Sequence, residues 1–169
     1  MPDKIWMVNN AAEEKILRSK IAPLEFAKEN KKELRELVKR MRIAMKAANG
    51  VGLSANQIGI KKRIFIAQVP DDQGHLKFYT IVNPEIAKNS IEKDATEEGC
   101  LSVPLSYGIV ERPAKITLNG FDLNGKKVKI KAGGLLARVF QHETDHLNGG
   151  LFIDKCKEVL TTTELPKKK

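Results

Sequence analysis

Two histidines and a glutamate lie close together in the last third of the chain. His142, Glu143 and His146 belong to the segment QHETDHL. If this segment is helical, residues four apart lie one turn above the other, so both imidazoles can reach one metal ion. The glutamate after the first histidine then lies beside the open position of that ion. The spacing therefore indicates a metal site; the alternative is two histidines that make ordinary hydrogen bonds in the core or at the surface.

A tetrahedral catalytic site with two histidines needs a third protein ligand if water keeps the fourth position. The chain has two cysteines, Cys100 and Cys156. We favour Cys100, because its segment EGCLSVP contains glycine and ends in proline, where a backbone bends toward a site. Cys156 lies in the lysine-flanked stretch DKCKE, and we expect an ordinary surface or packing cysteine there. His75, in the polar turn DDQGH, is expected to be a solvated loop histidine.

A third segment, GVGLSANQ at residues 50–57, combines small residues with an amide side chain. Small residues let a backbone approach a ligand closely, and Gln57 could place an amide donor there. A glycine that ends a helix accounts for Gly50 but not for the other residues. The segment is not a phosphate-binding loop, because the Lys-Ser or Lys-Thr pair of that motif is missing.

Two helices are expected to position these segments. Over residues 33–48 the apolar side chains recur at spacings of three and four, which places them on one stripe of a helix. Asn49-Gly50 is typical of the end of such a helix. A second helix should begin near Gly134 and contain LLARVFQHETDHL. Because two adjoining stripes of it are apolar, we expect this helix in the middle of the fold.

Strands are expected between the two helices, whereas the residues before about position 33 show only weak patterning. Four runs are strand-like, with a turn at residues 71–74 between the first two: 63–69, 78–82, 115–123 and 126–131. Asn124-Gly125 favours a two-residue hairpin turn, so the last two runs should pair in antiparallel fashion. A helix, antiparallel strands and a central helix indicate an α+β fold rather than a doubly wound sheet.

Length and composition limit the class of protein. A chain of 169 residues can bury one hydrophobic core, and we expect one domain over residues 1–169. With 41% hydrophobic and 30% charged residues, the chain is neither disordered nor fibrous. No apolar run approaches the roughly 20 residues that span a bilayer, and the first ten residues lack the apolar stretch of a secretory signal. We therefore expect a cytoplasmic protein without a membrane partner, and only two cysteines fit a reducing compartment.

The charge of the chain permits a polyanionic neighbour. The formal net charge is +9, which makes proximity to nucleic acid electrostatically favourable. The basic residues are nevertheless spread along the sequence. The one dense run, 167–169, is expected to belong to a flexible basic tail over about residues 165–169. Charge alone thus indicates no particular partner.

Taken together, GVGLSANQ, EGCLS and QHETDHLNG, in this order, resemble the three signature motifs of the peptide deformylase family. Members of this family are metal hydrolases that remove the formyl group from the N-terminal formylmethionine of nascent bacterial and organellar proteins. The resemblance covers roughly residues 34–154. It implies a compact α+β fold in which antiparallel strands pack around a central metal-binding helix.

The resemblance also implies roles for individual residues. The cysteine of EGCLS and both helix histidines bind the metal in this family, so Cys100, His142 and His146 would be the ligands. The glutamate of the histidine motif is the general acid and base of the family, and Glu143 would take that role. Hydrolysis of an N-formyl amide to formate and a free amine is the reaction that follows.

Substrate contacts carry over in the same way. In the family, the glutamine of the first motif and the backbone amide after the metal cysteine bind the developing oxyanion. Gln57 and the N–H of Leu101 occupy those positions. The positions expected to surround the formyl group or the methionine side chain are Val51, Gly52, Leu135 and Val139.

The resemblance further suggests a cofactor and partners. One thiolate and two imidazoles suit zinc, iron, cobalt or nickel, and the ligands alone do not choose among them. The family favours one divalent ion, ferrous iron, in the cell. The expected partners are N-formylmethionyl nascent peptides, with proximity to the ribosome and without sequence-specific nucleic-acid binding.

Three residues depart from the family pattern. Ser54 stands where alanine is usual, Asn56 is uncommon before the glutamine, and Tyr107 replaces an arginine of some members. These departures leave the catalytic groups intact. If they have an effect, we expect it on the contacts with the substrate backbone.

Two other functions are weaker interpretations of the same residues. A small zinc peptidase would take its third ligand from a downstream histidine or glutamate. No histidine follows His146, only Glu158 and Glu164 lie in the segment beyond it, and EGCLS would have no role. A basic RNA-binding domain without catalytic activity is the other alternative. Bound metal and release of formate would indicate the enzyme, whereas salt-dependent affinity for RNA would indicate this binding domain.

Overall fold

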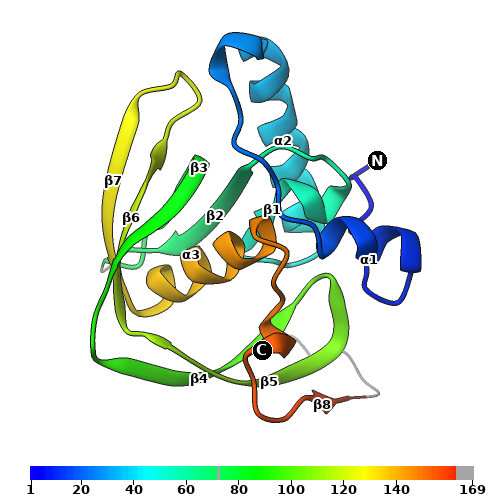
Figure 1. Cartoon of the computed structure of the whole chain (residues 1–169), viewed down its shortest axis with the longest axis vertical. Helices are drawn as coiled ribbons and strands as arrows, with labels where there is room; N and C mark the ends of the chain where they lie inside the picture. The colour runs from blue at the N-terminus through cyan, green and yellow to red at the C-terminus, as the bar shows by residue number, and fades with distance from the viewer. Residues whose placement is uncertain (72, 163–169) are drawn as a thin grey trace.

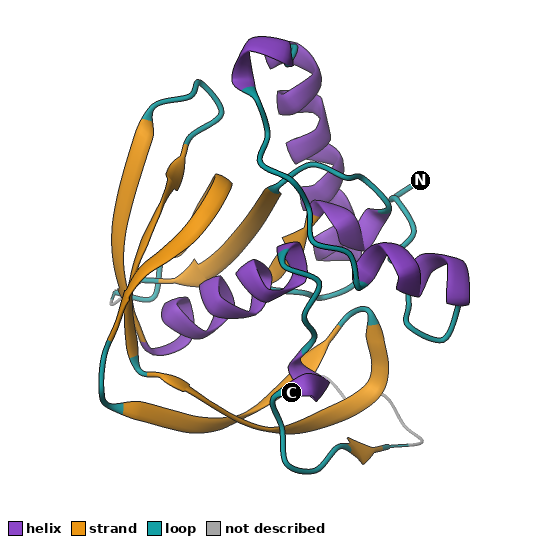
Figure 2. Ribbon diagram, viewed as in Figure 1, coloured by secondary structure: helices purple, strands orange, loops and turns teal. Residues whose placement is uncertain are grey.

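The computed structural model describes residues 1–71 and 73–162, and the expected tail over residues 165–169 lies outside this part. Helix α3 lies between two antiparallel sheets, and α1 and α2 stand on one side of the molecule (Figures 1 and 2). The α+β class is thus confirmed.

The helices and 3-10 turns are α1 (Ala11–Leu17), η1 (Phe26–Lys28), α2 (Lys31–Ala47), η2 (Ala55–Ile58), α3 (Gly134–Leu147) and η3 (Phe152–Asp154). The strands are β1 (Gly52–Ser54), β2 (Ile64–Pro70), β3 (Leu76–Asn89), β4 (Lys93–Cys100), β5 (Val103–Pro113), β6 (Lys115–Phe121), β7 (Lys127–Gly133) and β8 (Leu160–Thr161).

Two sheets of different size enclose α3. The larger has five strands in the order β1-β2-β3-β6-β7, and the smaller has three in the order β4-β5-β8. All neighbouring strands pair in antiparallel fashion. Phe140 of α3 is fully buried and packs against the rings of Phe65 and Tyr79, at centroid distances of 5.4 and 5.3 Å. Burial of a side chain of this size contributes about 1.5 to 3 kcal/mol to folding, so this contact holds α3 on the large sheet.

Helix α2 confirms the stripe predicted from the apolar spacing. Its buried residues include Leu34, Leu37 and Met41, which pack with β1 and β2 in one cluster. The helix begins at Lys31, two residues before the predicted start. The reason is a cap: the side chain of Asn30 accepts hydrogen bonds from the first free backbone N–H groups of the helix. The weakly patterned region before it contains a further short helix, α1, with the same kind of asparagine cap.

The hairpin of β4 and β5 was not among the predicted strands. Its two strands run over residues 93–100 and 103–113, and they pair from Lys93–Pro113 to Cys100–Val103. Most side chains of β4 are exposed, so this segment lacks the apolar alternation by which a half-buried strand is recognised. β3 is likewise longer than predicted, because its second half continues through bulges to pair with β6.

The turn between β6 and β7 is wider than the two-residue turn predicted from Asn124-Gly125. The last paired residues are Phe121 and Lys127, which leaves five residues, 122–126, in the loop. The side chain of Asp122 accepts hydrogen bonds from two backbone N–H groups of this loop, at 2.8 and 2.9 Å. This side-chain acceptor stabilises the wider loop, while the antiparallel pairing itself is confirmed.

Gly149, after the end of α3, provides a test of the fold. Its φ is +81°, and an added Cβ would overlap the carbonyl oxygen of Arg18. We expect Gly149→Ala to lower the free energy of unfolding by at least about 2 kcal/mol, because it adds a backbone clash to the cost of a left-handed conformation. Thermal unfolding measures this loss. Gly74→Ala is the matched control, since its φ is +82° and nothing lies within 4 Å; equal losses in the two variants would contradict the clash.

Candidate metal centre

Three potential metal ligands converge where β4 ends against α3. Cys100 is the last residue of β4, and His142 and His146 lie on one face of α3. The Sγ of Cys100 and the Nε2 of His142 each lie 3.2 Å from the Nε2 of His146. All three ligand atoms lie within 4.8 Å of one another. The structure therefore brings together the three residues that the sequence predicted as ligands.

This donor set fits a divalent cation. A tetrahedral ion bound at about 2.0 to 2.3 Å keeps its ligand atoms about 3.3 to 3.6 Å apart, close to the 3.2 Å separations observed here. One sulfur and two imidazole nitrogens suit zinc, iron, cobalt or nickel rather than calcium or magnesium. The site thus has the chemistry and the spacing of a transition-metal site.

A buried carboxylate orients the first histidine. Glu98 accepts a hydrogen bond from the Nδ1 of His142 at 3.0 Å, which leaves Nε2 directed to the other ligand atoms. Arg112 donates to both oxygens of Glu98, at 2.5 and 2.9 Å, and Arg138 donates to one of them at 2.6 Å. Arg112 also pairs with Asp145 at 2.8 Å. The predicted site did not include these four residues. For Glu98 alone the sequence holds a signal, because it lies two residues before Cys100.

Electrostatics differ between the two histidines. Burial lowers the pKa of His142, but hydrogen bonds with Cys100 and Glu98 outweigh it and raise the pKa to about 10. Burial and the charge of His142 hold the pKa of His146 well below its ordinary value. Burial raises the pKa of Glu98, yet the hydrogen bonds from Arg112 and His142 hold it well below the usual range. These opposite shifts favour a positive charge on His142 rather than on His146, and a cation that binds the Nε2 of His142 takes the place of the proton on that nitrogen, while Nδ1 keeps its hydrogen bond to Glu98.

Glu143 lies in a dry environment beside these ligands. Its side chain is buried, and burial raises its pKa to about 7, against the opposing effects of His142 and Ser54. An added Cβ at Gly52 would overlap the Oε1 of Glu143, so only glycine leaves room for this carboxyl group. A carboxyl group with a pKa near neutrality can both accept and return a proton.

Gln57 is fixed by hydrogen bonds at both ends of its amide. Its Oε1 accepts from the backbone N–H of Ser54 at 2.9 Å. Its Nε2 donates to the hydroxyl of Ser102 at 3.1 Å and lies 3.7 Å from the Sγ of Cys100. The N–H of Leu101 makes no hydrogen bond within the described part of the chain. The Leu101 N–H is thus a free donor next to Cys100, while the two N–H groups of the Gln57 amide face Ser102 and Cys100.

The predicted pocket residues are placed less closely together. Val51 and Leu135 are half-exposed, at 47% and 52%, whereas Val139 is buried in the core cluster of the large sheet. Gly52 lies against Glu143, as described above. Leu135 and Val139 lie one turn apart on α3, whereas Val51 immediately precedes β1. Their role in a side-chain pocket remains a prediction.

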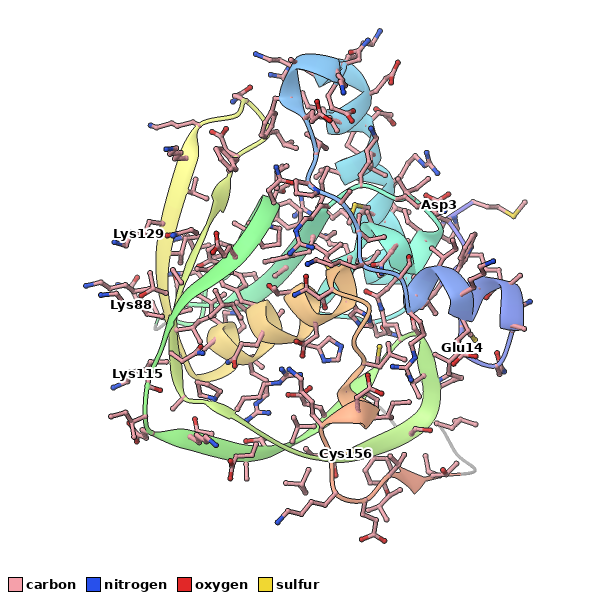
Figure 3. All side chains as sticks on the ribbon, viewed as in Figure 1. Asp3, Glu14, Lys88, Lys115, Lys129 and Cys156 are labelled. Carbon is pink, nitrogen blue, oxygen red and sulfur yellow. The ribbon has the colours of Figure 1, made fainter. Side chains whose placement is uncertain are left out.

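The remaining candidates lie apart from the ligands. Cys156 follows η3 (Figure 3) and packs against the cluster that contains Val103, Val110 and Phe152. It is not among the three residues whose ligand atoms converge. Its interpretation as a packing cysteine agrees with this position. His75 is in the exposed turn between β2 and β3, as expected.

Comparison with known proteins gives matches over nearly the whole chain. The family model described as polypeptide deformylase matches residues 6–161. The peptide deformylase of Halothermothrix orenii is 46% identical over 144 residues, which cover 85% of this chain and 89% of the relative. The crystal structure of class I type b peptide deformylase from Acinetobacter baumannii with bound Met-Ala-Ser has a TM-score of 0.83 and 34% identity, and the match covers 92% of this chain and 98% of that chain. The peptide deformylase of Thermotoga maritima matches with a TM-score of 0.81 and 34% identity over 94% of this chain and 99% of that chain.

The two cysteines give a direct test of the ligand set. We expect Cys100→Ser to weaken metal binding by more than about 100-fold, because it removes the one thiolate among the three donors. Cys156→Ser should leave metal binding unchanged, because its sulfur lies outside this set. Metal analysis of anaerobically purified proteins, followed by titration with a competing chelator, measures both. Equal losses would show that the third ligand is misassigned.

Proposed function

Because this chain belongs to the polypeptide deformylase family, we propose that Cys100, His142 and His146 hold its catalytic metal ion. The protein is a metal-dependent hydrolase that removes the formyl group from the N-terminal formylmethionine of nascent polypeptides and releases formate. One observation above all supports the assignment to these residues: three transition-metal donors converge beside a buried carboxyl group that has a pKa near 7.

We propose ferrous iron as the native metal, with zinc, nickel and cobalt as possible substitutes. The mixed sulfur and nitrogen donor set supports this group of ions, and the family favours iron within it. When bound, such an ion supplies Lewis acidity, which lowers the pKa of water and polarises a carbonyl oxygen. Glu98 and its two arginines support the site by holding the Nδ1 proton of His142, so that Nε2 is free to bind.

Glu143 is proposed as the residue that moves protons. It accepts a proton from the water that attacks the formyl carbon and then delivers a proton to the departing amine. Formate leaves with the oxygen of that water, and the methionine keeps a free amino group. Its position supports this role, because Glu143 adjoins His142 in sequence and its carboxyl group is shielded from bulk water. Shielding keeps the pKa of Glu143 near the value at which both proton transfers are favourable.

Gln57 and the N–H of Leu101 are proposed to stabilise the charge that develops on the formyl oxygen. Both groups flank Cys100, and the Gln57 amide is held in one orientation by Ser54 and Ser102. Donors fixed before the reaction do not have to reorganise as the charge appears. Fixed donors of this kind typically contribute about 100- to 1000-fold to turnover each.

The methionine side chain is proposed to lie against Val51, Leu135 and Val139. The two half-exposed side chains offer apolar surface that a substrate can cover. The Acinetobacter baumannii relative binds Met-Ala-Ser, a peptide that begins with methionine, which supports a peptide of the same kind as ligand here. An unbranched thioether adapts readily to such a surface.

We also propose that the enzyme works in the cytoplasm, close to the ribosome, without sequence-specific binding of nucleic acid. No helix in the described residues is long and apolar enough to span a bilayer. Lys88, Lys115 and Lys129 are exposed, and Figure 3 shows them along the outer side of the β3-β6-β7 sheet. None of these three lysines has an ion-pair partner within the described ranges. Such a face supports electrostatic attraction to a phosphate-rich neighbour.

Formyl and acetyl substrates test the proposed function. A formyl carbon bears only hydrogen, whereas an acetyl methyl group would clash in the tight site that we propose Gly52, Gln57 and Leu101 to bound. We expect turnover of formyl-Met peptides to exceed that of acetyl-Met peptides by at least about 100-fold. An enzyme-coupled assay for formate, beside an amine assay for both substrates, measures the ratio. Comparable turnover of the two peptides would contradict the assignment.

Glu143→Gln separates metal binding from proton transfer. The substitution keeps the size of the side chain but removes the basic carboxylate, so we expect turnover to fall by about 100-fold or more. Metal content and affinity for a product such as Met-Ala-Ser should stay close to the wild-type values. Loss of the metal together with activity would instead make Glu143 a ligand or a structural support, and near-normal turnover would remove it from the mechanism.

A further inference from the structure

Ser54, one of the departures from the family pattern, is in direct contact with Glu143. The side chain of Ser54 is fully buried, and its Oγ lies 2.7 Å from the Oε2 of Glu143. The same Oγ lies 2.9 Å from the backbone carbonyl oxygen of Glu143. An alanine at this position has no atom that could make either contact.

The hydroxyl group of Ser54 can hold Oε2 of Glu143 in both protonation states of that carboxyl group. Ser54 has one hydroxyl proton to donate. When Glu143 is a carboxylate, Ser54 donates this proton to Oε2. When Oε1 carries a proton, Oε2 remains an acceptor and keeps the same hydrogen bond. Neither arrangement requires movement of a heavy atom.

The backbone of Ser54 is held in place independently of Glu143. Ser54 pairs with Phe65 across β1 and β2, and its N–H donates to Gln57. Two residues further along, the Nδ2 of Asn56 donates to the carbonyl oxygen of His146 at 2.8 Å. The second departure from the family pattern thus ties the same segment to the next turn of α3. The distance between Ser54 and Glu143 is therefore fixed by the fold.

On the basis of the proposed function, we propose that Ser54 is a positioning residue that keeps the carboxyl group of Glu143 in one orientation throughout the reaction. Glu143 has to accept a proton and later return it. Ser54 offers a hydrogen bond to Oε2 before and after that transfer, and Gly52 leaves room for Oε1 on the other side. The oxygen Oε1 is then the one left to exchange protons with water and substrate.

Ser54→Ala tests this proposal. We expect kcat to fall about 10- to 100-fold, because a carboxyl group without its anchor samples unproductive orientations. KM and metal content should change by less than about twofold, since the Ser54 side chain contacts no ligand atom and alanine keeps the backbone N–H that bonds Gln57. Ser54→Thr restores the hydroxyl and should recover most of the lost kcat.

A double-mutant cycle distinguishes positioning from a general structural effect. If Ser54 acts through Glu143, then Ser54→Ala should have no further effect on turnover in the Glu143→Gln background. Thr144→Val is the control: the Thr144 hydroxyl is also buried on α3, but it donates only to the carbonyl oxygen of Phe140. This variant should lose some stability and keep its kcat.

Three results would overturn the proposal: an unchanged kcat in Ser54→Ala, equal losses in the wild-type and Glu143→Gln backgrounds, or a similar kcat loss in Thr144→Val. Failure of the proposed function has a different signature, since the wild-type protein would then release no formate from formyl-Met peptides. A wild-type enzyme that depends on Glu143 but not on Ser54 would refute only the role of Ser54.

Discussion

The buried carboxylate of Glu98 is the interaction on which the arrangement of the site depends. It receives hydrogen bonds from Arg112 on β5 and from Arg138 and His142 on α3, while it lies itself on β4. A charge buried in this way is tolerated only when its partners are fully in place, and removal of one partner leaves an uncompensated charge. The cluster therefore sets the position of the β4–β5 hairpin relative to α3, and with it the position of Cys100 relative to both histidines.

The large sheet has a different task. It supplies an apolar surface for α3 through Phe65 and Tyr79, which pack against Phe140 of the helix, and it carries β1, from which Gly52 and Ser54 reach Glu143. One sheet thus determines where the three candidate ligands meet, and the other determines how the carboxyl group of Glu143 is held. The proposed chemistry lies where the two sheets face the same helix, because there a thiol, two imidazoles and a shielded carboxyl group come together.

The two histidines of the candidate site could be predicted from the sequence because their spacing is a local signal. His142 and His146 are one helical turn apart, and the apolar stripes of α3 and α2 follow the helical period. The β4–β5 hairpin could not be predicted in the same way, since its exposed strands lack an apolar pattern. Glu98, Arg112 and the contact of Ser54 with Glu143 depend on pairings of residues 14 and 89 positions apart, which no local pattern contains.

The separation of the ligands along the chain also determines when a metal ion can be acquired. Cys100 belongs to a hairpin whose strands are adjacent in sequence, and contacts of this kind form early in folding. Both histidines lie more than 40 residues later, on a helix that must first pack against the large sheet. As the chain is synthesised from its N-terminus, the thiol therefore exists before its partner histidines do. Metal loading thus becomes a late event in maturation. An ion bound by these residues would link β4 to α3 and close the long loop between them.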